Sequence, residues 1–180
     1  MPVPKRILVA VGGGIAAFKV AALVSQLAQG GYRVQVVMSN AATKFVGKAT
    51  FAALSGQQVA TDMFDQDRWP LGPHIELAVD LDLLVVAPAT ADLIAKFSSG
   101  RADCLISTIY LQVQCPVLLA PAMSSSMWSK AAVQRNVQQL REDGVHLAGP
   151  SIGWLSCRQQ GEGRMAEPAE IQDYIKRLLV

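Results

Sequence analysis

A run of three glycines near the N-terminus has the residue types and the spacing of a phosphate-binding turn. Residues 12–14 are all glycine, an apolar run at 7–11 precedes them, and a helical pattern of apolar residues follows directly. Glycine lets the backbone approach a ligand closely, and a helix start offers unpaired N–H groups with a partial positive charge. A tight strand-to-helix turn without a ligand is the alternative, but such a turn needs one glycine rather than three. The run therefore predicts a phosphate or nucleotide site.

The residues around this turn favour flavin mononucleotide, FMN, over a dinucleotide. Residues 12–17 match the dinucleotide pattern Gly-x-Gly-x-x-Ala, which is weak evidence alone. An NAD site has an acidic residue at the end of the second strand to hold the ribose, whereas Ser39 and Asn40 stand there in this sequence. FMN has no adenosine ribose to hold, so a hydroxyl and an amide suit it. NADP remains the competitor, although Arg33 lies at the wrong end of that strand for a 2′-phosphate.

Apolar strands that alternate with amphipathic helices must position these groups, and this order predicts an α/β fold. Most of the predicted strands are continuously apolar, as in parallel sheets that helices cover on both faces. We expect strands at 7–11, 32–38, 57–64 (or an irregular connection there), 81–87, 116–120 and 145–148. We expect helices at 15–29, 43–54, 92–99, 102–111, 129–141 and 169–179, with a short one opening at 74 and loops at 65–73 and 149–168. The sequence thus predicts one FMN-binding domain, residues 1–180, with a Rossmann-like (flavodoxin-like) three-layer fold and a mainly parallel sheet.

The carboxyl ends of the predicted strands bring four separated segments to one edge of the sheet. They are the glycines at 12–14, Ser39 with Asn40, a turn at 88–90, and residues 121–124. Ligands of open parallel sheets bind along this edge. We therefore expect the cofactor there.

Composition excludes several classes of protein. Hydrophobic residues make up 51% and charged residues 17% of the 180, so the chain can bury a core and is not disordered. A net charge of +2 without a basic run gives no reason to expect nucleic acid. The low charged fraction indicates that some apolar surface is buried against other subunits.

Cysteine usage and hydropathy favour a soluble, cytoplasmic protein. The cysteines at 104, 115 and 157 are an odd number without a disulfide framework, which favours a reducing compartment. The spacing of the His and Cys residues offers no metal site. The segment from Lys5 to Phe18 has features of a signal peptide, but its three glycines fit a strand and a turn better. No apolar run reaches the ~18 residues of a membrane span.

Five motifs, in order, resemble those of the homo-oligomeric flavin-containing cysteine decarboxylases. They are Gly-Gly-Ile-Ala-Ala-Phe-Lys at 13–19, His-Ile-Glu-Leu-Ala at 74–78, Ala-Pro-Ala-Thr-Ala-Asp at 87–92, Pro-Ala-Met-Ser-Ser-Ser-Met-Trp at 121–128 and Cys-x-x-x-Gly-x-Gly-Arg-Met at 157–165. The resemblance covers nearly the whole chain. It implies trimers or multiples of trimers, up to a dodecamer, with FMN at the subunit interface. It also implies decarboxylation of 4′-phosphopantothenoylcysteine to 4′-phosphopantetheine in coenzyme A biosynthesis.

The resemblance assigns catalytic roles to two residues. His74 matches a histidine that takes or orients the substrate thiol proton, a role that suits an imidazole because it titrates near neutral pH. A surface histidine that caps a helix is the alternative. Cys157 matches a cysteine on a mobile flap that reprotonates the enethiolate left by decarboxylation, and Gly161 and Gly163 in a long loop agree with a lid. An inert cysteine is the alternative, and Arg158-Gln159 depart from the Gly-Asp that follows this cysteine in the family.

The resemblance also assigns cofactor and substrate contacts along the predicted edge. The cofactor contacts are Gly13, Gly14, Ile15, Ser39, Pro88, Ala89, Thr90, Ala91 and Ala122, and the substrate contacts are Met123, Ser124 and Met127. At position 124 the family usually has an asparagine that binds the substrate carboxylate, whereas serine offers one donor in place of an amide with two. An unmade contact of this kind costs about 1–3 kcal/mol. Ser124 therefore weakens decarboxylation, is replaced by Ser125, Ser126 or a water, or marks another substrate.

Other functions remain open on the sequence. The chain could decarboxylate another C-terminal cysteine, such as that of a peptide, although a peptide decarboxylase would not need Cys157. Prenyl transfer to FMN ranks lower, because relatives with that activity lack the motifs at 74–78 and 121–123. A non-catalytic FMN-binding homologue and an NADP-dependent oxidoreductase complete the set. Bacterial relatives are often fused to the synthetase that makes the substrate, which here would be a separate protein or lie outside this sequence.

Overall fold

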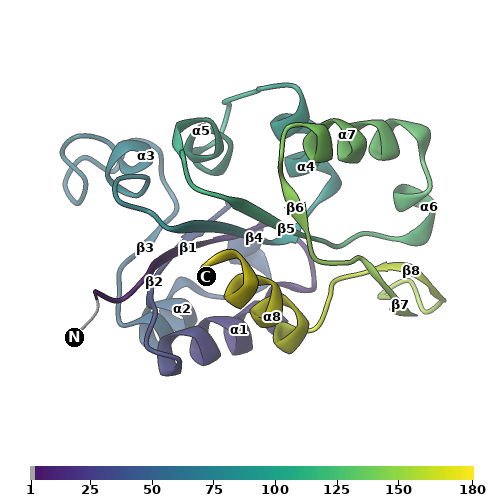
Figure 1. Cartoon of the computed structure of the whole chain (residues 1–180), viewed down its shortest axis with the longest axis horizontal. Helices are drawn as coiled ribbons and strands as arrows, with labels where there is room; N and C mark the ends of the chain where they lie inside the picture. The colour runs from purple at the N-terminus through teal and green to yellow at the C-terminus, as the bar shows by residue number, and fades with distance from the viewer. Residues whose placement is uncertain (1–2) are drawn as a thin grey trace.

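A six-stranded sheet lies at the centre of the structure, with helices on both of its faces (Figure 1). The structure is a computed structural model that describes residues 3–180. All neighbouring strands in this sheet run parallel, in the order β3-β2-β1-β4-β5-β6. The strands are β1 (Arg6–Val11), β2 (Arg33–Met38), β3 (Val59–Ala60), β4 (Leu83–Ala89), β5 (Val117–Pro121) and β6 (His146–Leu147). The predicted Rossmann-like parallel fold is confirmed.

Two groups of helices cover the two faces of the sheet and form the outer layers. Helices α1 (Ala17–Gln29), α2 (Lys48–Ser55) and α8 (Pro168–Leu178) cover one face (Figure 1). The other face is covered by α3 (Pro73–Glu76), α4 (Ala91–Ser98), α5 (Leu105–Gln112) and α7 (Ala131–Glu142). A 3₁₀ turn, η1 (Ala42–Lys44), and the short helix α6 (Ser125–Trp128) complete the list.

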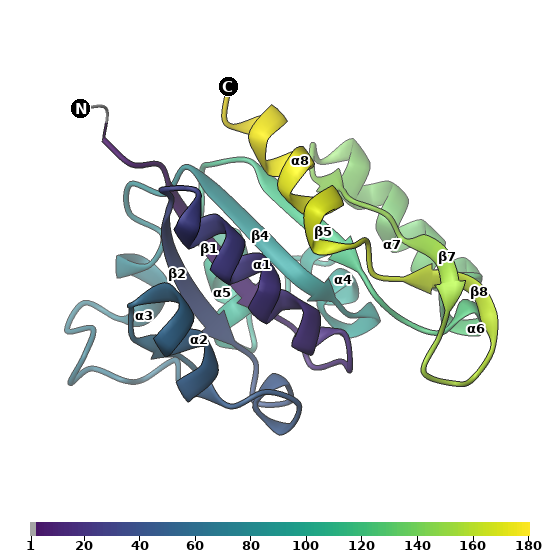
Figure 2. The same cartoon turned by 90° about the horizontal axis from the view of Figure 1, so that it is seen from below.

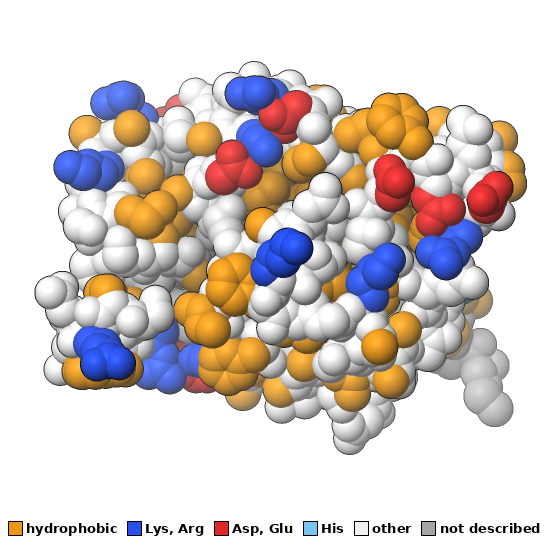
Figure 3. All heavy atoms as spheres, turned by 180° about the vertical axis from the view of Figure 1, so that it is seen from behind, with side chains coloured by type: hydrophobic (Ala, Val, Ile, Leu, Met, Phe, Trp, Pro, Cys, Tyr) orange, Lys and Arg blue, Asp and Glu red, His pale blue; other side chains and the backbone are white. Residues whose placement is uncertain are grey.

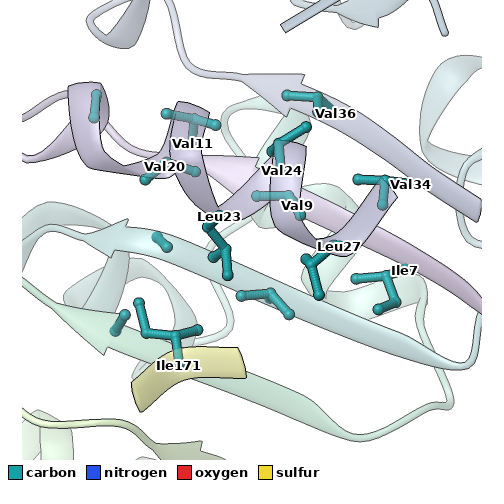
Figure 4. Packing of buried hydrophobic residues seen from close by; sticks show 14 of the residues in the cluster. Ile7, Val9, Val11, Val20, Leu23, Val24, Leu27, Val34, Val36 and Ile171 are labelled. Atoms are coloured by element: carbon teal, nitrogen blue, oxygen red, sulfur yellow. The ribbon is translucent and has the colours of Figure 1, made fainter. Parts of the chain in front are cut away.

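Burial on both faces of the sheet explains why the central strands are almost continuously apolar. In β1, Ile7, Val9 and Val11 face one core cluster, while Leu8 and Ala10 face the other. Figure 4 shows the first cluster, where α1 packs on β1 and β2 through its buried stripe of Val20, Leu23, Val24 and Leu27. Because both faces of each central strand are buried, a continuous hydrophobic run is the expected pattern.

Strand β4 runs two residues further than the sequence indicated. We expected a turn at 88–90, but Pro88 and Ala89 lie in the strand, and only Thr90 leaves it to cap α4. The pairing with β5 shifts its register between Val86 and Ala89, which lets a residue without an N–H fit into the strand. The Ala89 carbonyl then accepts a hydrogen bond from the Ala122 N–H at 3.1 Å.

One predicted helix is divided in the structure, and another is preceded by a short helix that was not predicted. The helix expected at 43–54 is a 3₁₀ turn followed by α2, and the extended backbone of Gly47 separates them. The helix expected at 129–141 starts at Ala131 as α7, and α6 precedes it. The Ser124 hydroxyl caps α6, and the side chain of Trp128 at the end of α6 is buried in the core.

The segment at 149–168 is not an irregular loop. It contains an antiparallel hairpin of β7 (Ser151–Trp154) and β8 (Gln160–Arg164), so the strand predicted at 145–148 is not the last one. The hairpin lies beside α6, at the end of the molecule far from α3 (Figures 1 and 2). Within residues 3–180, no helix combines the length and the hydropathy that crossing a membrane requires.

Candidate cofactor and substrate site

The glycine turn lies at the point where the chain order of the sheet reverses. Strands β1 and β4 are neighbours there, and such a switch point is where open parallel sheets bind ligands. A Cβ on Gly12 would lie 2.2 Å from the Pro88 carbonyl oxygen, and one on Gly13 would lie 2.3 Å from the Ala41 Cβ. Two of the three glycines are therefore required by contacts within the protein. At Gly14 the nearest atom would be 3.7 Å away, so only this glycine leaves its Cβ position open.

Two hollows flank this turn along the carboxyl edge of the sheet. Hollow 1 has a volume of about 740 Å³ and lies over the ends of β2 and β4; its lining includes Gly13, Ser39, Asn40, Phe64, Thr90, Ala91 and Met127. Hollow 2 has a volume of about 450 Å³ and lies between α1 and the hairpin; its lining includes Gly14, Ile15, Ala122, Met123, Ser124 and Trp154. Both volumes lie in the range of small-molecule sites. Most of the residues predicted to contact cofactor and substrate are thus divided between two hollows with the glycine turn between them, whereas Pro88 and Ala89 line neither hollow.

Polar groups along the turn are arranged to receive an anion. Within the described part of the chain, the backbone N–H groups of Ile15 and Ala16 have no protein acceptor. Ser39 and Thr90 each start a helical turn, since their hydroxyl oxygens accept from Ala42 N at 3.1 Å and from Leu93 N at 3.3 Å. Free N–H groups at a helix start, with small residues around them, fit a phosphate group.

The three predicted substrate residues point to different sides of α6. Met123 and Ser124 line hollow 2, whereas Met127 lines hollow 1 and is 46% exposed. The Ser124 hydroxyl caps α6, since its oxygen accepts from Met127 N at 3.4 Å, and it shares a hydrogen bond of 3.1 Å with the Ser126 hydroxyl. Ser125 donates its proton to the Glu162 carbonyl at 2.7 Å and is committed to the hairpin. Ser125 therefore does not replace the family's asparagine.

The hairpin is packed tightly against the segment that carries Ser124. The Met123 N–H donates to the Gly163 carbonyl at 2.9 Å, and a Cβ on Gly163 would lie 2.3 Å from the Met123 carbonyl oxygen. A Cβ on Gly161 would lie 2.3 Å from the Ser125 hydroxyl. The sequence offered these glycines as support for a lid, which stays a prediction. They permit close approach of the hairpin to residues 123–125.

Cys157 lies in the turn at the tip of this hairpin. Its side chain is exposed and lines neither hollow, but it directly follows Trp154, Leu155 and Ser156, which line hollow 2. The turn is closed by a hydrogen bond of 2.8 Å from the Leu155 N–H to the Gln159 carbonyl. The tip of the hairpin is therefore adjacent in sequence to the lining of hollow 2.

His74 lies at the other end of the sheet. Helix α3 comes shortly before the start of β4, and the Arg6 guanidinium at the start of β1 donates to the Glu76 carbonyl at 3.1 Å. The glycine turn begins only after β1 ends, roughly 17 Å further along at about 3.3 Å per strand residue. The structure does not bring His74 together with the other predicted residues within one chain. Its Nδ1 is buried, and no hydrogen-bond partner exists for it among the described residues.

A group of charged side chains in hollow 2 was missed in the sequence. The Lys19 ammonium donates to Glu167 Oε1 at 2.7 Å, and the Arg164 guanidinium donates to the same oxygen. The hydrogen bond from Lys19 and the two positive charges hold the pKa of the Glu167 carboxyl below its usual value. Lys19 ends one quoted motif and Arg164 lies within another, but neither motif indicates that the two side chains meet at Glu167, which is 148 residues from Lys19.

The two remaining cysteines have structural surroundings. Cys104 precedes α5, and its thiol lies 3.2 Å from the Ser107 hydroxyl. Burial raises the pKa of the Cys115 thiol, which makes it less reactive. Among residues 3–180, no group of three or more His, Cys, Asp or Glu side chains is placed to hold a metal ion.

Comparison with known proteins gives a consistent set of relatives. The family model described as "Flavoprotein" matches residues 1–180. The coenzyme A biosynthesis bifunctional protein CoaBC of Mycobacterium bovis is 45% identical over 177 residues, which are 98% of this chain and 42% of that protein. The chain thus spans about two fifths of the length of that curated relative.

Two solved structures share the fold over almost their whole length. The FMN-dependent cysteine decarboxylase SpaF is 33% identical with a TM-score of 0.85, and the alignment covers 97% of this chain and 95% of SpaF. A Cys-to-Ser mutant of a PPC decarboxylase, complexed with pantothenoylaminoethenethiol, is 29% identical with a TM-score of 0.85, covering 97% of this chain and 98% of that one.

Proposed function

The chain belongs to the Flavoprotein family, and on that premise we propose that it is an FMN-dependent decarboxylase of 4′-phosphopantothenoylcysteine. Residues 1–180 would form its flavin-binding domain, and the reaction would be a carboxy-lyase step of coenzyme A biosynthesis in the cytoplasm. The observation that carries this proposal is the 45% identity to a coenzyme A biosynthesis protein across 98% of the chain. The bifunctional character of that relative supports a link to the synthetase that supplies the substrate.

The residues along the carboxyl edge fit FMN. The free N–H groups of Ile15 and Ala16 and the Ser39 hydroxyl would hold its phosphate, and the open Cβ position of Gly14 leaves room beside them. The ring would lie against the small residues that end β4 and follow β5, namely Pro88, Ala89, Thr90, Ala91 and Ala122. When bound, FMN supplies the oxidation and the later reduction that let a cysteine carboxylate lose CO2.

His74 would move the substrate thiol proton at one ring nitrogen. Its Nδ1 is buried, which leaves Nε2 as the atom that a thiol can approach. A neutral imidazole accepts a proton there and can return it later. The short helix fixes the ring, because Gly72, with φ of 99°, and Pro73 start α3 directly before it.

A complete site would need two copies of the chain. His74 lies at the amino end of the strands, whereas the glycine turn and both hollows lie at the carboxyl end, so a second copy would supply the histidine. Exposed apolar side chains support such contacts, since Phe64 lies at hollow 1 and Ile15, Phe18 and Trp154 lie at hollow 2. Figure 3 shows hydrophobic side chains gathered in several groups on one face of the molecule. A trimer, or a dodecamer built from trimers, would bury these groups.

Cys157 would act as the acid that returns a proton to the product. Its place at the hairpin tip, next to the residues that line hollow 2, puts it on the side where Ser124 lies. A thiol on an exposed turn is accessible for proton exchange. The hairpin strands are anchored by Ser125 and Met123, so only the tip would be free to move.

The first test combines a visible spectrum with a turnover assay. We expect purified protein to be yellow and to release CO2 from phosphopantothenoylcysteine under anaerobic conditions, and His74→Asn to lose this release while it keeps FMN. A yellow protein without CO2 release would contradict the decarboxylase and favour a binding homologue. A colourless protein that cannot take up FMN would contradict the cofactor.

A second test asks whether the histidine comes from another copy. His74→Asn and Cys157→Ser chains, each inactive alone, are co-expressed under two affinity tags, and the mixed oligomers are isolated. We expect part of the turnover to return, because some sites then contain an intact His74 from one chain and an intact Cys157 from the other. Mixed oligomers that stay inactive would contradict a shared site.

A further inference from the structure

The two hollows differ in charge. The described residues that line hollow 2 include Lys19 and Arg164 and no carboxylate, whereas Lys96 in hollow 1 stands among Asp62, Asp92 and Asp103. Lys96 is already paired, with Asp92 at 3.1 Å and Asp103 at 3.2 Å. Glu167 neutralises one of the two cations of hollow 2 and leaves a net charge of +1 there. Among the charged side chains, those of hollow 2 therefore favour a carboxylate more than those of hollow 1 do.

The Arg164 guanidinium is held in place by contacts on two sides. It donates to Glu167, and it lies across Gly153 in the neighbouring strand, where a Cβ would be 2.7 Å from its Cδ and 2.9 Å from its Nη1. A guanidinium has five N–H donors, and the bond to Glu167 uses one at Nη2. Lys19 likewise keeps donors beyond the one that it gives to Glu167. A pre-positioned cation with free donors, beside the apolar side chains of Phe18 and Trp154, is suited to bind a carboxylate.

Ser124 lies in the same hollow but has little to offer a carboxylate. Its oxygen accepts from Met127 N, and its single proton is available only when Ser126 supplies the proton of their shared hydrogen bond. Ser125, the next hydroxyl, is used by Glu162. The neighbouring cations are thus the strong donors of hollow 2.

Resting on the proposed function, we propose that Arg164, assisted by Lys19, binds the carboxylate of the substrate's cysteine end. In this chain the pair would take over the role that the family's asparagine has at position 124. Gly153 would be a positioning residue, because the absence of a side chain there leaves the space that the Arg164 guanidinium occupies.

The test uses three ligands that separate the two anions of the substrate. Phosphopantothenoylcysteine has a carboxylate and a phosphate, pantothenoylcysteine has the carboxylate alone, and 4′-phosphopantetheine has the phosphate alone. Binding to FMN-loaded protein is measured by calorimetry, with all variants made on a His74→Asn background to suppress turnover. Arg164→Gln should weaken both carboxylate ligands by about tenfold to a hundredfold and change 4′-phosphopantetheine by less than about twofold.

Two further variants make the result specific. Gly153→Ala keeps every charge but displaces the guanidinium, so it should show the same ligand selectivity with a smaller loss, even where Arg164→Gln folds poorly. Arg135→Gln, which removes an exposed arginine from α7, should leave all three affinities unchanged. Retained FMN absorbance shows that each variant is folded.

Several outcomes would overturn the inference. An equal loss for 4′-phosphopantetheine would assign Arg164 to the phosphate, and no loss for the carboxylate ligands would remove it from the site. Absence of binding by the His74→Asn protein would also overturn it. The proposed function is tested separately by CO2 release from the unsubstituted protein, so carboxylate-selective binding without CO2 would contradict the reaction and leave the anion site standing.

Discussion

Glycines permit neighbouring segments to pack closely both in the turn at 12–14 and in the hairpin at 151–164, which lie in different layers of the molecule. In the turn, Gly12 and Gly13 let the ends of β1 and β4 and the segment after β2 come together. In the hairpin, Gly161 and Gly163 let β8 lie on residues 123–125. The turn is joined to the buried core on both faces of the sheet, whereas the hairpin is a separate two-stranded sheet at the edge.

The spacing of a glycine pair does not indicate whether the glycines face a ligand, permit movement or permit close packing. The Gly-x-Gly pattern at the turn suggests a ligand, and the same pattern in the hairpin suggests flexibility. In both places the structure shows backbone or side-chain atoms within 2.4 Å of where a Cβ would be. Only Gly14 has its side-chain position open toward a hollow. We therefore expect substitutions at these sites to differ mainly in how much of the molecule they disturb.

The largest expected effect is that of Gly12→Ala. The new Cβ would lie 2.2 Å from the Pro88 carbonyl oxygen, and neither strand end can move away easily. The free energy of unfolding should therefore fall by about 3 kcal/mol. Urea unfolding followed by circular dichroism measures this. Gly14→Ala is the matched control and should change stability by less than about 0.5 kcal/mol. Equal losses for the two variants would contradict the distinction between the glycines.

Gly163→Ala should open the hairpin without unfolding the sheet. Gly163 has φ of 128°, and its Cβ would lie 2.3 Å from the Met123 carbonyl oxygen, so attachment of the hairpin should weaken by about 2 kcal/mol. Hydrogen exchange in residues 151–164 should speed up, while the urea midpoint of the whole chain should move less than with Gly12→Ala. A decrease in the urea midpoint as large as that of Gly12→Ala would show that the hairpin and the sheet unfold together.

A double-mutant cycle at Ser125 and Gly161 gives a smaller and more specific effect. Ser125→Ala removes a hydrogen bond of 2.7 Å to the Glu162 carbonyl and should cost about 1 kcal/mol. Gly161→Ala alone would place its Cβ 2.3 Å from the Ser125 hydroxyl, but without that hydroxyl the next Ser125 atom is 3.3 Å away. The loss of stability in the double variant should therefore be about 1 kcal/mol smaller than the sum of the two single losses. Additive losses would contradict the direct contact.

The smallest effect should be a pH-dependent one at Glu167, which joins the hairpin to α1. Its pKa is lowered in the folded protein, so its contribution to stability is complete above the unfolded value of about 4.3 and is lost as pH falls through the folded value. Glu167→Gln should lower stability at neutral pH by only about 0.5 kcal/mol, because the pair is partly exposed. The difference from the unsubstituted protein should vanish below the folded pKa. A difference that persists in acid would assign the effect to packing.

Much of the fold was predictable from the sequence because its pattern is local. The central strands are continuously apolar and β-branched, and the glycine and proline positions mark their ends, so the parallel sheet could be predicted. The register shift that extends β4 through Pro88 and the hairpin after residue 150 could not. Both depend on partners distant in sequence, namely β5 for the first and residues 123–125 for the second.

The candidate site divides in the same way. The sequence supplied Ser39, Thr90 and Ser124, and the hydroxyl of each accepts a backbone hydrogen bond at the start of a helical turn at the expected edge. The sequence did not show that His74 lies at the opposite end of the strands, because a motif does not indicate at which end of the sheet its residues lie.

The residues by themselves determined an α/β chain of the flavoprotein type with its small residues at the strand ends, since hydrophobic period and turn chemistry act over a few neighbours. Tertiary structure alone decided that Lys19 and Arg164 share one oxygen of Glu167 in hollow 2. Lys19 is 148 residues from Glu167 along the chain, and their charge pair is created only when the fold brings them within a few ångströms of each other.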